Sequence, residues 1–188
     1  SYCLKLHREW QGRSARIIAE LQSYDADILC LQECSKKCFE AFSKQLGDTS
    51  GASGPYAGFH HSAFLPSRRA AAEARVSVTG LATFVRPQAW KPVSVQAVRL
   101  GSQAEARGHA GSLREKLQSQ SDSVLLVLLE HVASGVRLAV GNLHLHWDPR
   151  FPHLKASQAE MAARALAQFS SSEGDGRAVL ALCGDFNS

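Results

Sequence analysis

The sequence predicts a layered α/β fold with more than one sheet. Segments with apolar residues at helical spacing lie near both ends of the chain, and apolar runs typical of strands lie beside and between them. Two of these runs are separated only by Ala133, Ser134 and Gly135, which indicates an antiparallel hairpin. Such a hairpin fits a purely parallel, doubly wound sheet less well, because it pairs antiparallel strands.

The composition fits one globular domain. The chain has 188 residues, of which 45% are hydrophobic and 20% charged, so it can bury a substantial core. Its longest apolar run, from Val124 to Leu129, is far shorter than the roughly 20 residues that cross a bilayer, so no membrane span is expected. The net charge of +4 suits an anionic substrate but does not indicate a protein that coats nucleic acid.

The first part of the chain predicts a helix, a strand and a second helix. Residues 8–23 carry apolar positions at helical spacing, with charges on the opposite face. Residues 26–33 form an apolar run that ends in a carboxylate, as in a strand covered on both faces. Ser35 is then placed to cap a helix that continues to about Leu46.

The rest of the chain predicts a series of strands, followed by one more helix and one more strand. Alternating or β-branched apolar residues mark four strands, at 81–86, 93–100, 123–132 and 136–145. Pro149 and Pro152 interrupt the chain before a helix at about 154–169. An apolar run at 178–183 then gives the last strand.

Two segments between these elements are expected to be insertions or surface excursions. Residues 62–79 and 102–121 are rich in Ala, Ser, Gln, Gly and Arg, which is typical of segments outside a packed core. The second segment is expected to contain a short helix around 113–117. The chain shows no internal repeat.

The cysteines indicate the redox environment. The five cysteines form an odd set, and Cys30, Cys34 and Cys38 recur at four-residue spacing without histidines in zinc-finger register. We interpret them as reduced thiols of an intracellular and most simply cytoplasmic protein, with no organelle excluded and a structural zinc site as the alternative. The chain begins at Ser1 without Met, so we expect it to be a segment of a longer protein.

The last strand is followed by a carboxylate and a carboxamide two positions apart, Asp185 and Asn187. If the strand continues through them, both side chains point to the same side and can together hold a metal or a phosphate. The alternative is a turn, because Asp and Asn side chains also hydrogen-bond to their own backbone.

Two other strands end in polar side chains. Glu33 follows the first strand, and Asn142, His144 and His146 alternate along a later one. Each has a structural alternative: Glu33 as a carboxylate at a helix start, and the histidines as partly buried strand residues. Zinc bound by His144 and His146 is a weak possibility, because zinc usually takes more His or Cys ligands at set spacings. The three strand ends together favour a shared polar rim.

The oxygen donors of this rim favour magnesium, with Mn²⁺ as an alternative ion. Mg²⁺ typically takes one or two carboxylates plus substrate phosphates, which suits Glu33 supported by Asp185. Hydrolysis of a phosphodiester needs an oriented water and donors to the phosphate oxygens. Asp185 is the candidate for orienting the water, and Asn142, His144 and Asn187 are the candidate donors.

Three motifs, in order along the chain, resemble the endonuclease/exonuclease/phosphatase superfamily, and most closely its carbon catabolite repressor deadenylase, nocturnin and Angel group. Leu31-Gln32-Glu33 resembles the family's LQE motif, Asn142-Leu143-His144 with Trp147-Asp148-Pro149 its N-x-H-x-x-W-x-P segment, and Gly184-Asp185-Phe186-Asn187-Ser188 its GDFNS motif. The resemblance implies a DNase I-like fold of four layers, a two-sheet β-sandwich flanked by helices. Residues 1–188 are then a partial domain without its C-terminal part.

The resemblance also implies roles for the motif residues. Glu33 is similar to the family's magnesium ligand, and Asp185 to the acid that orients the water beside the metal. Asn187 is similar to the amide that contacts metal or phosphate. Asn142 and His144 are similar to the pair that binds and stabilises the substrate phosphate.

The chain also departs from the family pattern. Thr79 stands where relatives often have an acidic residue, and Ser123 stands where a relative has an amide. Trp147 is expected to be structural, as a core aromatic. The family's Asn on a strand before Tyr2, and its Asp-Tyr and Ser-Asp-His segments after Asp185, have no counterpart in these residues.

The function implied by the resemblance is that of a magnesium-dependent phosphodiesterase acting on RNA, most closely a 3′ exoribonuclease of the poly(A) deadenylase type in mRNA decay. One alternative is a phosphatase or 2′,5′-phosphodiesterase acting on a nucleotide. Another is a catalytically silent module that binds RNA or a protein partner, of which the sequence indicates none in particular. Because the Ser-Asp-His segment is not found, we expect little or no turnover from the 188 residues alone.

Overall fold

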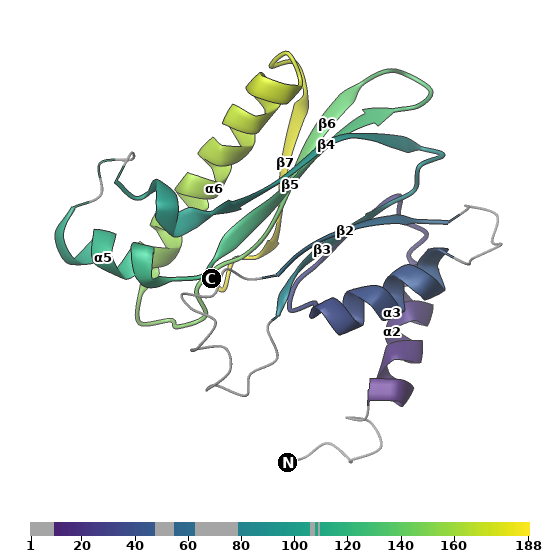
Figure 1. Ribbon diagram of the computed structural model, residues 1–188, viewed down its shortest axis with the longest axis horizontal. Coiled ribbons are helices and arrows are strands. Elements are labelled where there is room, and N and C mark those ends of the chain that lie inside the picture. The colour runs from purple at the N-terminus through teal and green to yellow at the C-terminus, as the bar shows by residue number, and fades with distance from the viewer. Residues whose placement is uncertain (1–9, 48–54, 63–78, 106–107, 109) are drawn as a thin grey trace.

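Two sheets packed face to face, with helices on both outer sides, make up the structure (Figure 1). The computed structural model describes residues 10–47, 55–62, 79–105, 108 and 110–188. In the layer order, α2 and α3 cover the first sheet, and α6 covers the second. The predicted two-sheet, four-layer α/β sandwich is therefore confirmed.

The first sheet has three antiparallel strands in the order β1-β3-β2. They are β1 (Ile28–Leu31), β2 (Ala57–Ser62) and β3 (Gly80–Val85). The helices α2 (Trp10–Ser23) and α3 (Lys36–Gly47) pack on its outer face. Ser35 caps α3 as predicted, because its hydroxyl oxygen accepts a hydrogen bond of 3.3 Å from the backbone nitrogen of Cys38.

The second sheet has four strands in the order β4-β5-β6-β7. They are β4 (Trp90–Arg99), β5 (Ser123–His131), β6 (Arg137–His144) and β7 (Val179–Asp185). The first three are antiparallel, whereas β7 runs parallel to β6 after the crossover helix α6 (Pro152–Glu173). A 3-10 turn, η1 (Leu100–Gln103), and a short helix, α5 (Gly111–Ser119), connect β4 to β5.

β5 forms the centre of the core because both of its faces are buried. Leu125, Val127 and Leu129 point into the space between the two sheets. Val124, Leu126 and Leu128 point the opposite way, into the cluster covered by α6. Full burial of such a side chain contributes about 1.5–3 kcal/mol, so this strand anchors the sandwich from both sides.

The structure also differs from the sequence expectations in several elements. β2 was not predicted, because Ala57–Ser62 has no β-branched apolar residue and its side chains are only half-buried. β1 is shorter than the expected 26–33, because the chain leaves the sheet at Gln32. The helix expected near 113–117 is α5.

The roles of the two predicted insertions stay predictions. Residues 63–78, most of the first segment, lie outside the described residues.

Among the helices that the structure does describe, none combines the length and the apolar composition that crossing a membrane requires.

Gly184 is predicted to be essential for the pairing of β7 with β6. Its φ is +137°, a region that side chains rarely adopt, and an added Cβ would lie 1.9 Å from the backbone oxygen of Leu143. Gly184→Ala should therefore lower the free energy of unfolding by about 1–3 kcal/mol in urea titrations. Gly47→Ala is the control, because nothing lies within 4 Å of that position. Equal stability of the two variants would contradict the prediction.

Candidate active site

Three strand ends meet at one cavity. Glu33, His144 and Asp185 line a cavity of about 520 Å³ at the rim of the sandwich. His144 and Asp185 meet there because β6 and β7 are parallel neighbours and these two residues are paired in register. Glu33 arrives from the facing sheet, two residues after the end of β1.

Glu33 is turned into the cavity by an unusual backbone conformation. Its φ is +54°, which is uncommon for a residue other than glycine, and its side chain is exposed. The next residue, Cys34, fixes the turn, because its side chain is buried and its backbone nitrogen donates to the oxygen of Gly80 at 2.9 Å. Left-handed conformations of this kind often occur at functional sites.

Asp185 and Asn187 do not share a strand face, contrary to the expectation. β7 ends at Asp185, and the chain turns so that the backbone nitrogen of Asn187 donates to Asp185 Oδ1 at 2.8 Å. The Asn187 side chain donates to the oxygen of Leu145 at 2.8 Å and so ties the turn to the end of β6. The alternative expectation, a turn in which the Asp side chain bonds to the local backbone, is therefore confirmed. The same turn also holds the Asp185 carboxylate at the cavity.

His144 stands next to this carboxylate. Its Nε2 lies 3.8 Å from Asp185 Oδ2, too far for a hydrogen bond but close enough for an ion pair when the imidazole is protonated. About a quarter of the His144 side chain, 26%, is exposed, so the ring remains accessible to a substrate.

Asn142 lies beneath the cavity and not on its surface. Its side chain is fully buried, and its Nδ2 donates to the backbone oxygens of Leu31 at 3.2 Å and Ala82 at 3.0 Å. Its Oδ1 accepts a hydrogen bond of 2.8 Å from Gln32 Nε2. In this structure Asn142 therefore joins the two sheets and positions the ends of β1 and β6, whereas the sequence suggested a direct contact with phosphate.

His146 is not among the residues that line the cavity with Glu33 and Asp185. Its ring packs beside Trp147 and Phe151, and its backbone nitrogen donates to Gln158 Oε1 at 3.0 Å. Within the described ranges, no group of three or more His, Cys, Asp or Glu side chains is arranged to hold a metal. The donor set thus offers little to zinc, which normally takes four such ligands in structural sites and three in catalytic ones.

The donors of the cavity do fit magnesium. Glu33 and Asp185 supply hard carboxylate oxygens on two sides of an open, water-accessible space. Mg²⁺ keeps several of its waters and needs only one or two protein carboxylates, so a pair is sufficient.

Two of the cysteines that line the cavity are held as neutral thiols. Cys30, Cys34 and Cys38 line it, and these and Cys183 are free thiols. Burial raises the pKa of Cys30 and of Cys34 to about 12, so both thiols stay protonated at neutral pH. A protonated thiol is a poor nucleophile, so neither of these two side chains is a reactive thiolate.

The structure adds Arg13 to the site. This exposed residue of α2 lines the same cavity as the carboxylates of the strand ends. The sequence predicted that the charged side chains of this helix lie on its solvent face. The helical pattern alone does not indicate which charged side chain reaches a neighbouring strand end. A fixed positive charge here suits a phosphate-containing substrate.

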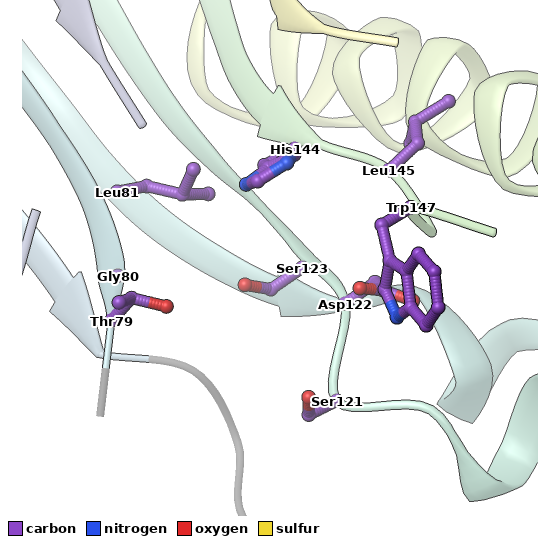
Figure 2. A pocket seen from close by; sticks show the side chains of 9 residues that line it. All are labelled: Thr79, Gly80, Leu81, Ser121, Asp122, Ser123, His144, Leu145 and Trp147. Carbon is purple, nitrogen blue, oxygen red and sulfur yellow. The ribbon is translucent and has the colours of Figure 1, made fainter. Parts of the chain in front are cut away.

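A second cavity begins on the other side of His144. It measures about 180 Å³, and Figure 2 shows Trp147 and Asp122 on one side of it, with Thr79 and Leu81 on the other. Thr79 and Ser123, the two positions where the chain departs from the family pattern, thus lie in the same cavity. Trp147 is 70% exposed, so its expected role as a core aromatic is wrong.

Asp122 is a further carboxylate that the sequence did not single out as functional. Burial raises its pKa, and a hydrogen bond of 2.5 Å from Gln158 Nε2 to its Oδ2 opposes that rise. Through Gln158, which also binds the backbone of His146, this carboxylate is connected to the segment that follows β6.

The four-layer sandwich with its polar rim defines a DNase I-like fold. A family model described as "Endonuclease/Exonuclease/phosphatase family" matches residues 6–188. The chain belongs to this family, and the predicted resemblance is confirmed.

Relatives by sequence include two fungal proteins named "CCR4-Not complex 3'-5'-exoribonuclease subunit Ccr4". The one from Yarrowia lipolytica is 30% identical and the one from Candida albicans 28%, over 95% and 96% of this chain. This chain spans only 28% and 24% of those proteins, about a quarter of their length.

Similar solved structures belong to the predicted group. A structure of ANGEL2, described as a 2',3'-cyclic phosphatase, has a TM-score of 0.71 and 25% identity, over 99% of this chain and 47% of its own. The human Nocturnin catalytic domain has a TM-score of 0.69 and 21% identity, over 97% of this chain and 59% of its own. At 21% identity, the similarity to Nocturnin supports the fold alone.

Removing the Asn142 amide should destabilise the sandwich. Asn142→Ala leaves the oxygens of Leu31 and Ala82 without this donor in the interior, so the free energy of unfolding should fall by about 2–4 kcal/mol in urea titrations. Gln32→Ala is the matched comparison, because it removes one half-buried bond to the same amide and should cost less than half as much. A loss for Asn142→Ala no larger than that for Gln32→Ala would contradict this role.

Proposed function

We propose that the cavity lined by Glu33, His144 and Asp185 is the metal-binding part of a magnesium-dependent phosphodiesterase site that acts on RNA. Within that class, the proposed activity is that of a 3′ exoribonuclease of the poly(A) deadenylase type. The observation that carries the proposal is that three separate strand ends bring these side chains to one cavity. Relatives named as 3'-5'-exoribonuclease subunits support it.

The carboxylates of Glu33 and Asp185 would hold the ion, with Mn²⁺ as an alternative to Mg²⁺. A bound divalent ion neutralises charge on the phosphate and favours ionisation of a water. Asp185 Oδ1 is already engaged by the backbone of Asn187, which fixes the carboxylate and leaves Oδ2 to orient the attacking water. Arg13, on the part of the cavity lined by α2, would attract the substrate phosphates.

His144 would donate a hydrogen bond to a non-bridging phosphate oxygen. Its ring is accessible and lies beside Asp185, so a phosphate near the ion is also near the imidazole. In this proposal Asn142 and Asn187 act as positioning residues, the first beneath the site and the second on the Asp185 turn.

The free thiols agree with the intracellular, cytoplasmic location that we propose.

A second candidate activity is the removal of a phosphate from an RNA end or a nucleotide. The 25% identity to ANGEL2, described as a 2',3'-cyclic phosphatase, favours it. Both activities need the same ion and the same attacking water, and they differ only in the substrate group placed beside them.

Glu33→Gln should weaken Mg²⁺ and Mn²⁺ binding at least about tenfold in calorimetric titrations, because loss of a direct ligand costs no less than loss of an outer-shell partner. In a longer protein that includes this chain, the rate of oligoadenylate hydrolysis should fall by at least the same factor as the metal affinity. Glu173→Gln is the control, an exposed carboxylate at the end of α6 and outside the cavity. Unchanged metal affinity in Glu33→Gln would refute the proposed metal site.

A substrate panel separates the candidate activities. Oligoadenylate, mixed-sequence RNA, RNA with a 2′,3′-cyclic phosphate end and a dinucleotide phosphate are compared with Mg²⁺ present. The proposal predicts turnover of oligoadenylate first, by a protein that includes this chain and extends to the length of its relatives. The 188 residues alone are expected to bind metal with little turnover. Metal binding without turnover of any substrate by the longer protein would favour the silent RNA-binding or partner-binding alternative.

A further inference from the structure

Two cysteines face each other across the gap between the sheets, close to the proposed metal site. Cys30 lies on β1 and packs against the apolar cluster between the two sheets, and Cys183 lies on β7. The two thiols are near enough to act on each other, because burial and then the neighbouring Cys183 raise the pKa of Cys30 to about 12. This pair therefore connects one sheet to the other.

The registers of the two sheets place these cysteines at the same level. In the first sheet Cys30 is paired with Thr83, and in the second Cys183 is paired with Asn142. Side chains of paired residues on neighbouring strands point to the same side of a sheet. Asn142 Nδ2 donates to Thr83 Oγ1 across the gap at 3.4 Å. Each partner of that contact thus has a cysteine beside it, one on β1 and one on β7.

The strands β1 and β7 are free to approach each other. Each is the end strand of its sheet and, in the part of the chain that the structure describes, is paired on one side only. Cα atoms of the two strands already come within 8 Å of one another. A disulfide needs a Cα separation of about 4.4–6.8 Å, so a small movement of two end strands is sufficient to form one.

We propose that Cys30 and Cys183 are an oxidative modification site, at which hydrogen peroxide forms a reversible disulfide between the two sheets. The existence of this site does not depend on the proposed function. Disulfides in the cytosol are usually transient and sense the redox state, which fits the location proposed above.

The reaction proceeds in two steps. The Cys183 thiolate attacks hydrogen peroxide first, because Cys30 is held protonated; the O–O bond breaks, and a sulfenic acid and hydroxide are formed. Cys30 then loses its proton and attacks the sulfenic sulfur, so that the S–S bond forms and the S–O bond breaks. The closeness of the two side chains compensates for the poor nucleophilicity of Cys30. In total the thiols lose two electrons and two protons, and the peroxide becomes two waters.

The disulfide changes the proposed metal site, and this consequence rests on the proposed function. Cys30 precedes Glu33 by three residues in the sequence. Cys183 precedes Asp185 by two. Drawing the two strands together therefore alters the separation of the two carboxylates. Because Mg²⁺ demands near-ideal octahedral geometry at about 2.0–2.1 Å, displaced carboxylates bind it less tightly.

Mass-spectrometric mapping tests the bond itself. The 188-residue chain is treated with hydrogen peroxide without denaturant, the remaining thiols are blocked with N-ethylmaleimide, and the digest is compared with and without dithiothreitol. The expected product is a pair of peptides linked through Cys30 and Cys183, which dithiothreitol separates by exchange. The linked pair should be absent from Cys183→Ser. It should be present in Cys38→Ser, the control, which changes another thiol of the same cavity.

The mapping also defines what would overturn the inference. Failure of peroxide to produce any linked pair would do so. A linked pair that joins Cys30 or Cys183 to a different cysteine would have the same meaning, because the facing positions on β1 and β7 would then not determine the partner.

Calorimetric titration with Mn²⁺, after the peroxide has been removed, tests the consequence for the metal site. Oxidation should lower the affinity of the parent and of Cys38→Ser about tenfold, the effect of disturbing the support of a ligand. Dithiothreitol should restore the affinity, and Cys183→Ser should not respond. Unchanged affinity in a parent that carries the disulfide would contradict the effect on the site. No Mn²⁺ binding by the reduced parent would instead reject the proposed function, and the linked peptides would still decide whether the disulfide forms.

Discussion

The geometry of the rim depends on one buried amide between the two sheets. Asn142 binds the backbone of Leu31 and Ala82 in the first sheet while it forms part of β6 in the second. An unpaired amide in this interior would be costly, so the two sheets are held at one relative position and not allowed to slide. Glu33 follows Leu31 by two residues, and His144 follows Asn142 by two, so the same contact sets the separation of the proposed metal and phosphate ligands.

The rest of the site follows from how the chain leaves its strands. Glu33 turns away from β1 with a left-handed backbone, and Gly184 allows β7 to approach β6 so closely that Asp185 is fixed opposite His144. The polar groups therefore stand on strand ends that have little freedom. His144 lies between two cavities, one lined by carboxylates that suit an ion and one lined by hydroxyls and the indole of Trp147.

The sequence predicted most of the fold, because its strands and helices have strong local patterns. β5 contains an unbroken apolar run from Val124 to Leu129, whereas β2 was missed because its Gly and His residues form no such pattern. Glu33, His144 and Asp185 were predicted as neighbours from their positions at strand ends, and the structure brings them together. The burial of Asn142 and the clustering of Thr79, Ser123 and Trp147 depend on which sheet faces which, and no local pattern contains that information.

The carboxylates of Glu33 and Asp185 are proposed to form one site for a hard divalent ion. Anomalous diffraction from crystals soaked in Mn²⁺ tests it most directly, because it locates the ion without any assumption about substrate or turnover. We expect an anomalous peak in contact with both carboxylates and with water in the remaining positions. A peak bound instead by His144 and His146, with none at Glu33, would contradict it.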